Sequence, residues 1–95
     1  MIYNLKFFPT ALKEWKKLDN YIKRQLKKKL KERLLNPHVS GSKLRGFKNY
    51  YKIKLRSSGY RLVYEVVDEE IYIIVIVIGK RNRIEVYKQA KKRVK

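Results

Sequence analysis

Apolar residues recur at two different spacings along the chain, and the change of spacing indicates where strands and helices lie. Tyr3, Leu5 and Phe7 alternate with polar neighbours, which is typical of a strand. Helical spacing follows, first in Ala11, Trp15 and Leu18 and then in a series that repeats every four residues: Ile22, Leu26, Leu30 and Leu34. The pattern predicts an opening strand followed by two helices.

Residues that favour helix ends separate these two helices. Pro9 and Thr10 mark the start of the first helix, and Thr10 is its expected N-cap. Asp19 is expected to cap the second helix, and Asn36-Pro37 to end it. The result is an αα-hairpin with one apolar stripe and an outer face dense in Lys and Arg.

The second half of the chain alternates in the manner of strands. After a long loop, 37–49, the sequence YYKIKLR places Lys52, Lys54 and Arg56 on the face opposite Tyr51, Ile53 and Leu55. Ser57-Ser58-Gly59 turns the chain, and YRLVYEV returns with a matching apolar face. Either tight register of this hairpin puts Arg61 on the face of Lys52 and Lys54, since a one-residue slip would expose the apolar set.

The remaining segments complete a single domain. Residues 68–70, DEE, are expected to form a turn, and 71–79, IYIIVIVIG, is apolar on both faces, as a central strand is. Residues 84–94 are predicted to form a short basic helix that contains Tyr87. We therefore predict an α+β fold of order βααβββα, with an antiparallel four-stranded sheet and the helical hairpin on one face, over residues 1–95.

Composition narrows the class of function. With 26 Lys and Arg against 8 Asp and Glu, the 95-residue chain has a net charge of +18, which suits a polyanionic partner such as RNA, DNA, an anionic membrane or an acidic protein. Cysteine is absent, which excludes thiol catalysis, disulfides and cysteine-ligated zinc. The N-terminus lacks the pattern of a signal peptide, and the apolar run 71–78 is too short to span a bilayer, so we expect a cytoplasmic protein.

The cationic sheet face has two interpretations. It is either an ordinary solvated face or a site for backbone phosphates. No Asp or Glu occurs from residue 33 to 64, and the preceding loop adds Lys43, Arg45 and Lys48. Neighbouring cations repel one another unless an anion lies between them, and both features therefore favour a phosphate site.

A second basic segment follows the buried strand. In GKRNR, Lys80, Arg81 and Arg83 are either a basic turn or cations presented to phosphate by a rigid strand end. Tyr87 follows, and Ala90 and Val94 at helical spacing make core packing one interpretation. The other is a general base, because nearby cations lower the pKa of a phenol from its usual value of about 10.

The remaining titratable residues offer little catalytic chemistry. His38 is the sole histidine, so a two-histidine ribonuclease mechanism is excluded, and we interpret it as structural or incidental. The carboxylates show no metal-ligand clustering, and no P-loop, GxGxxG or zinc pattern occurs. We expect neither a metal nor a cofactor.

Four separated blocks, in order and spacing, resemble the RelE family of toxins. They are ALKEWKKL with LKKKL, KLRGF, YKIKLRSSGYRLVYEV and IGKRNRIEVY, and they cover nearly the whole chain. The resemblance implies the RelE/ParE toxin fold, which is similar to that of microbial ribonucleases. It also implies an mRNA interferase that cuts the codon in the ribosomal A site without a metal, by attack of the 2′-hydroxyl on the adjacent phosphate.

The family's catalytic residues correspond to five positions of this chain. The resemblance implies that Tyr87 is the base, aided by Lys52 or Lys54. Arg61 and Lys54 would stabilise the charge of the phosphate, and Arg81 would act on the leaving oxygen. Because an arginine pKa is above about 12, an electrostatic role for Arg81 is physically easier than proton donation. Arg45 and Arg83 match positions that hold mRNA or ribosomal RNA, and Lys43, Lys48 and Lys80 extend the same field.

The implied partners are the small ribosomal subunit with its 16S rRNA, mRNA, and a RelB-like antitoxin with an acidic wrapping segment. Operator DNA would be reached only through the antitoxin complex, and no membrane is involved. Two rival functions are a non-catalytic RNA- or ribosome-binding module and a ParE-like gyrase poison. The full set of cations and tyrosine argues against the gyrase poison.

Overall fold

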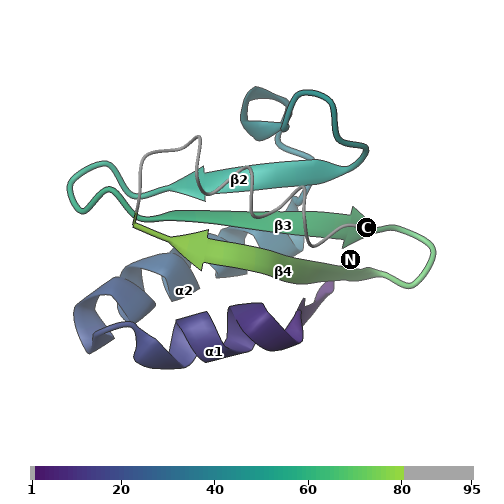
Figure 1. The fold of residues 1–95 in the computed structure, drawn as a ribbon. Helices are drawn as coiled ribbons and strands as arrows, with labels where there is room; N and C mark the ends of the chain where they lie inside the picture. Colours follow the sequence, from purple (N-terminus) through teal and green to yellow (C-terminus); the bar gives the residue numbers. More distant parts are fainter. Residues whose placement is uncertain (1, 81–95) are drawn as a thin grey trace.

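The computed structural model describes residues 2–80. The elements run in the order β1 (Asn4–Phe7), α1 (Pro9–Lys17), α2 (Asn20–Leu35), a short 3-10 helix (Ser40–Ser42), β2 (Tyr50–Lys54), β3 (Arg61–Val67) and β4 (Tyr72–Gly79). The predicted α+β class is confirmed, with the helices against one face of the sheet (Figure 1). The helix expected at 84–94 lies outside the described residues.

The four strands lie in the order β1-β4-β3-β2, so the apolar strand β4 is central, as predicted. β2, β3 and β4 are successively antiparallel. β1, however, pairs with β4 in parallel, from Asn4 opposite Tyr72 to Phe7 opposite Val75. The expectation of a purely antiparallel sheet is therefore wrong for β1. Parallel strands need a crossover connection, and here the whole of α1, α2, β2 and β3 provides it.

The helix ends agree with the sequence at two of the three positions that it marked. Asp19 caps α2, since its carboxylate accepts a hydrogen bond from the Ile22 amide at 2.9 Å, and α2 ends at Leu35, before Asn36-Pro37. The predicted cap at Thr10 is wrong, because α1 begins at Pro9 and its N-cap is Phe8, two residues before Thr10. Proline is well suited to the first helical position, where its missing N–H is no loss.

The hydrophobic core lies between the helices and the sheet. Ala11, Leu26 and Leu30 from the helices meet Ile53, Leu62 and Tyr64 from the strands, and all six are almost completely buried. A second, smaller cluster lies on the opposite face and consists of Leu44, Tyr50, Val63, Ile76 and Val77. That face is therefore not purely polar. Burial of each aliphatic side chain there contributes roughly 1.5–3 kcal/mol to the stability of the folded protein.

The turn between β2 and β3 determines which residues lie opposite one another. The Leu55 amide bonds the Tyr60 carbonyl and the Gly59 amide bonds the Leu55 carbonyl, both at 2.9 Å. Gly59 has φ of +80°, a conformation that glycine adopts without a steric penalty. The turn thereby pairs Ile53 with Leu62 and Tyr51 with Tyr64, which confirms the predicted apolar face.

Candidate nucleic-acid interface and catalytic face

Lys54, Arg61 and Gly79 form one row across three neighbouring strands. Lys54 of β2 lies opposite Arg61 of β3, and Arg61 lies opposite Gly79 of β4. Directly opposed residues of an antiparallel pair share a face, with Cβ atoms about 4.5–5.5 Å apart. The structure thus brings Lys54 and Arg61 together at the end of β4 from which Lys80 continues, as the alternation predicted.

Lys52 lies two residues further along the same face of β2, opposite Val63. Its side chain is half-buried, whereas that of Lys54 is exposed. The backbone at this position is anchored from behind, because Arg33 of α2 donates a hydrogen bond from Nη1 to the Lys52 carbonyl at 3.1 Å. The helix thereby supports the strand that presents both lysines.

Arg61 is held close to its own turn. Its Nη1 donates to the Gly59 carbonyl at 2.9 Å, and its Nε is buried with no hydrogen-bond partner among the described residues. A buried donor without a partner costs about 1–3 kcal/mol. An anion that drew the guanidinium outward would satisfy this donor, and a phosphate oxygen is a suitable acceptor.

The loop before β2 adds three exposed cations. Lys43, Arg45 and Lys48 surround a shallow hollow of about 500 Å³, which Leu44, Gly46 and Phe47 also line. The loop is attached to the sheet by the hydrogen bond from the Leu44 amide to the Tyr50 carbonyl, at 2.8 Å. Three of the five predicted RNA-binding residues, those of this loop, therefore lie together beside the start of β2.

The second basic segment is described only at its first residue. Lys80 is exposed, and its Nζ lies 6.0 Å from the centre of the Tyr60 ring. Arg81, Arg83 and Tyr87 lie outside the described residues, so their predicted roles stay predictions. Within residues 2–80, no group of three His, Asp or Glu side chains is placed to hold a metal ion, and no helix is long and apolar enough to cross a membrane.

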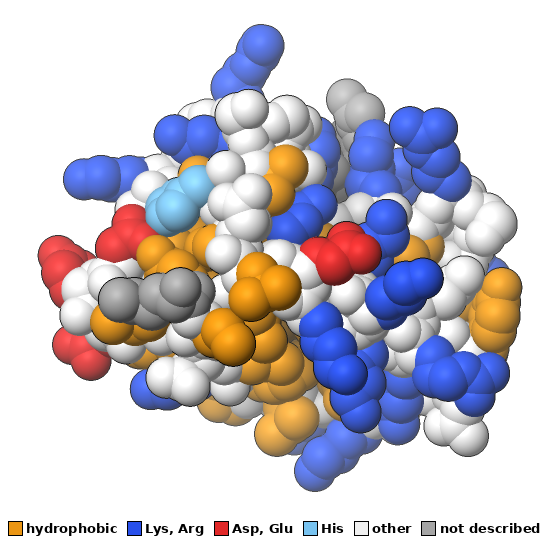
Figure 2. All heavy atoms as spheres, turned by 180° about the vertical axis from the view of Figure 1, so that it is seen from behind, with side chains coloured by type: hydrophobic (Ala, Val, Ile, Leu, Met, Phe, Trp, Pro, Cys, Tyr) orange, Lys and Arg blue, Asp and Glu red, His pale blue; other side chains and the backbone are white. Residues whose placement is uncertain are grey.

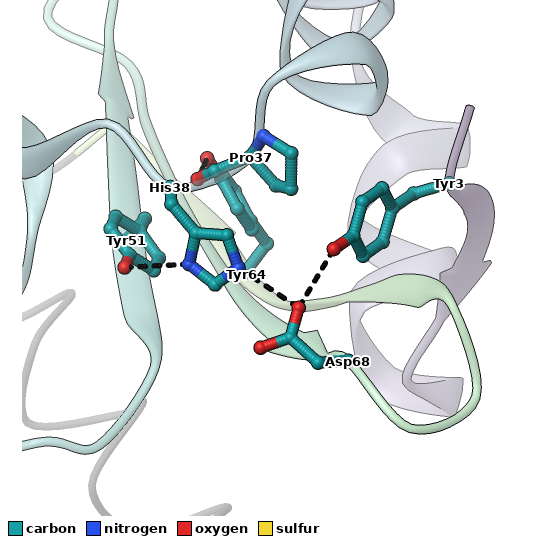
Figure 3. Close-up of polar contacts among 6 residues, drawn as sticks. All are labelled: Tyr3, Pro37, His38, Tyr51, Tyr64 and Asp68. Carbon is teal, nitrogen blue, oxygen red and sulfur yellow. Dashed lines mark hydrogen bonds and ion pairs between the residues drawn. The ribbon is translucent and has the colours of Figure 1, made fainter. Parts of the chain in front are cut away.

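A polar network on the helix side joins segments that are far apart in sequence (Figure 3). Asp68 Oδ1 accepts from the Tyr3 hydroxyl at 2.8 Å and lies 2.9 Å from His38 Nε2, while His38 Nδ1 lies 3.1 Å from the Tyr51 hydroxyl. The bonds to His38 and Tyr3 lower the pKa of Asp68, and the bond to Asp68 raises the pKa of Tyr3. The prediction that His38 is structural agrees with this geometry.

Tyr64 connects this network to α2. Its ring stacks on Tyr51 with centroids 5.8 Å apart, and its hydroxyl donates to the Pro37 carbonyl at 2.8 Å while accepting from Arg33 Nη1 at 2.9 Å. Burial raises the pKa of Tyr64, although the bond from Arg33 opposes this shift. The hydroxyl is therefore protonated at neutral pH and acts as a donor. Sequence analysis missed Tyr3, Arg33, Tyr64 and Asp68 as a set, since only the fold brings them together.

Charge is unevenly distributed over the surface. Figure 2 shows the side turned away in Figure 1, where Lys and Arg gather on one half and most of the visible carboxylates gather at the other end. The turn between β3 and β4 supplies three of the eight acidic residues, Asp68, Glu69 and Glu70. The net charge of +18 therefore acts from a surface with one acidic end.

Sequence and structure comparisons agree on the relatives of this chain. The family model for the ParE toxin of the type II toxin–antitoxin system parDE matches residues 5–85. The mRNA interferase toxin RelE of Escherichia coli K12 is 56% identical over 94 residues, 99% of each chain, and a putative RelE-like toxin of E. coli is 54% identical over 95 residues, covering both chains fully.

Solved structures extend the similarity to the fold. A double mutant of E. coli RelE in the free state superposes with a TM-score of 0.91 at 54% identity, covering all of both chains. RelE in the intact E. coli RelBE toxin–antitoxin complex superposes with a TM-score of 0.82 at 56% identity, over 85% of this chain and 99% of that one. An archaeal RelE from Pyrococcus horikoshii, at 21% identity and a TM-score of 0.65, shares the fold.

Proposed function

Because this chain belongs to the RelE family of type II toxins, we propose that it is an endoribonuclease that cuts mRNA in the ribosomal A site. The observation that carries the proposal is the row formed by Lys54 and Arg61, with Lys52 beside it on the same face. An RNA phosphate bound at this row lies within reach of both cations. The negative charge on the phosphate grows as the reaction proceeds, and the cations stabilise it.

The reaction needs no metal when the charge of the phosphate is stabilised by these cations. The 2′-hydroxyl loses its proton to a base, its oxygen bonds to phosphorus, and the bond from phosphorus to the 5′-oxygen breaks. The leaving 5′-oxygen takes up a proton. The products are a 2′,3′-cyclic phosphate and a 5′-hydroxyl end.

Each cation and the tyrosine has one role in this scheme. Lys54 and Arg61 stabilise the pentacoordinate phosphate, and Lys52 supports the base. Tyr87 is the base and Arg81 stabilises the leaving oxygen, both assigned from the family resemblance. The scheme has no histidine base, because His38 is engaged by Tyr51 and Asp68 on the helix side of the sheet.

A tyrosine base is weak, and the ribosome compensates by orienting the substrate. Holding a nucleophile in line with its target is worth several kcal/mol of barrier. The net charge of +18 and the exposed lysines of α2 draw the protein to ribosomal RNA. The loop cations Lys43, Arg45 and Lys48 hold the backbone of mRNA or 16S rRNA.

The inhibitory partner in this proposal is a RelB-like antitoxin. Relatives of this chain have been solved in complex with RelB, one of them with a short RelB peptide. An antitoxin segment that covers the cationic face must carry acidic residues, since each buried cation needs a counter-charge.

Mapping of mRNA 5′ ends after incubation with the purified protein tests the proposal. One sample contains programmed ribosomes, and the other contains the same mRNA free in solution. We expect cuts in the A-site codon on ribosomes and little cutting of free mRNA. Lys54→Gln should reduce the single-turnover rate about 10²-fold, as loss of one charge-stabilising donor does elsewhere. Lys13→Gln, which removes an equally exposed charge from α1, is the matched control.

Three results contradict the proposal. Equal cutting of free mRNA rules out dependence on the ribosome. Equal rates for the Lys54→Gln and Lys13→Gln variants rule out a catalytic role for the cation row, and ribosome binding without any cutting leaves a non-catalytic binding module. A ParE-like action on gyrase is disfavoured by the 56% identity to an mRNA interferase over 99% of the chain.

A further inference from the structure

A groove of about 710 Å³ lies at the other end of the cationic face from Lys54 and Arg61. It runs between the loop before β2 and the end of β3. In Figure 1 this is the end where β2 begins and β3 ends, opposite the β2–β3 turn. Its charged lining residues are Lys48, Glu65, Asp68 and Glu69, and its aromatic ones are Phe47 and Tyr50. The Asp68 carboxylate is already bonded to Tyr3 and His38 on the helix side of the sheet.

The groove belongs to the same sheet face as the cation row. Tyr50 lies opposite Glu65, two residues beyond the pair formed by Lys52 and Val63, which is itself two residues beyond Lys54 and Arg61. Residues at this spacing point to the same side of a sheet, and four residues of strand span about 13 Å. An RNA strand bound at Lys54 and Arg61 can therefore reach the groove with a nucleotide a short distance along the strand.

The chemistry of the groove differs from that of the cation row. Phe47 is half-buried, and its ring centre lies 5.2 Å from that of Tyr50, at an angle of 44°. Tyr50 donates a long hydrogen bond of 3.4 Å to Glu65 Oε1. Burial and the charge of Glu65 raise the pKa of Tyr50 to about 12, so its hydroxyl remains a donor to one carboxylate oxygen of Glu65.

A carboxylate repels phosphate but accepts hydrogen bonds from a base. Ionised glutamate is an acceptor only, so it pairs with the exocyclic amino group of cytosine and opposes the O4 carbonyl of uracil. Aromatic rings stack on unpaired bases of single-stranded RNA. Lys48 at the rim suits the phosphate of the same nucleotide, which a purely acidic groove would repel.

We propose that this groove binds an unpaired RNA base next to the cleavage site and that Glu65 makes it prefer cytosine over uracil. The inference rests on the proposed function only in taking the cationic face as the RNA-binding face. A basic segment of a protein partner would also meet Glu65. The position of Tyr50 and Glu65 on the sheet face of the cation row, and the presence of Lys48 among the residues that line the groove, favour RNA.

Short RNAs test the groove without the ribosome. We would measure binding of the full chain to 2′-O-methylated uridine tetramers, in which the nucleophile is blocked, with cytosine placed at each position in turn. At one position we expect cytosine to bind about 3–10-fold more tightly than uracil, the discrimination of one charged hydrogen bond at a partly exposed site.

Substitutions then assign the preference to Glu65. Glu65→Gln should bring the cytosine-to-uracil ratio close to 1, because a rotated amide serves either base. Glu70→Gln makes the same charge change in the β3–β4 turn, outside the residues that line the groove, and should leave the ratio unchanged. Phe47→Leu should weaken the binding of the cytosine and the uracil RNA about equally. Thermal unfolding checks that each variant is folded.

Three outcomes overturn the inference: no position prefers cytosine, the preference survives Glu65→Gln, or Glu65→Gln weakens binding of a RelB-like antitoxin and leaves the ratio intact. The last outcome would make the groove a protein-docking site. Absence of cutting on ribosomes by the parent protein refutes the proposed function and not this inference, because tetramer binding requires no cleavage.

Discussion

Removal of one buried hydroxyl tests how the cationic face is supported from behind. Tyr64→Phe keeps the ring that stacks on Tyr51 and deletes the oxygen that joins Pro37 to Arg33. The side chain is fully buried, so water cannot replace the lost partner without opening the core. We expect the folded state to lose stability and to retain its fold.

The magnitude follows from what each partner retains. The Pro37 carbonyl still accepts from the Val39 amide at 3.1 Å, and Arg33 Nη1 still donates to the Lys52 carbonyl at 3.1 Å. Neither group is left wholly unpaired, so the cost lies at the lower end of the range for a buried hydrogen bond, about 1–2 kcal/mol. For a domain of this size, the melting temperature should fall by about 5–10 °C.

Thermal and urea unfolding followed by circular dichroism measure this loss. Tyr51→Phe is the matched control, because it also removes one phenolic oxygen, but its partner His38 is exposed and water can replace the bond. The control should change the free energy of unfolding by less than about 0.5–1 kcal/mol. If both variants unfold at the same temperature as the parent, the bonds between Tyr64, Pro37 and Arg33 contribute nothing to stability, and our account of this support is wrong.

Two further predictions concern catalysis and pH. Tyr87→Phe and Arg81→Ala should each slow single-turnover cutting on programmed ribosomes by about 10²–10⁴-fold, while ribosome binding persists. An unchanged rate in Tyr87→Phe would show that the phenol only packs in the core, and Lys52 or Lys54 would become the candidate base. His38 and Tyr3 lower the pKa of Asp68 from its ordinary value of 3.8. The stabilisation that they confer is therefore present above that value and is lost as pH falls through the lower, folded-state pKa. Acid unfolding of Asp68→Asn should therefore depend less on pH below about 4 than that of the parent, and identical pH profiles would exclude this linkage.

The β2–β3 hairpin could be predicted in detail because two independent signals agree there. Strict alternation assigns Ile53 and Leu62 to one face, and the glycine-containing turn leaves few registers. The clustering of Lys54 with Arg61 follows from the same period of two. The direction of β1 could not be predicted, since four residues of strand carry no signal of how the chain returns to them. The start of α1 was displaced because Pro9 and Thr10 are both favoured at helix N-termini, at different positions.

The polar network shows a different limit of sequence reasoning. Tyr3 and Asp68 are 65 residues apart, and Asp68 alone is indistinguishable from any other acidic turn residue. Only the parallel pairing of β1 with β4 brings these two segments to one place. The groove was missed for a different reason: the predicted hairpin brings Tyr50 near Glu65, but nothing in the pattern showed that the loop before β2 leaves a hollow beside them.

Individual residues of β2 and β3 connect the cationic face of the hairpin with its helix-facing side. Lys52 presents its side chain to the cationic face, while its carbonyl is bonded by Arg33, which also bonds Tyr64. Tyr64 in turn is adjacent in the chain to Val63 and Glu65, which lie on the cationic face opposite Lys52 and Tyr50. A buried hydrogen-bonded network of this kind limits the movement of the backbone that carries the cations. Preorganised charge would serve the proposed cleavage, because donors that are already in place need no reorganisation when phosphate charge develops.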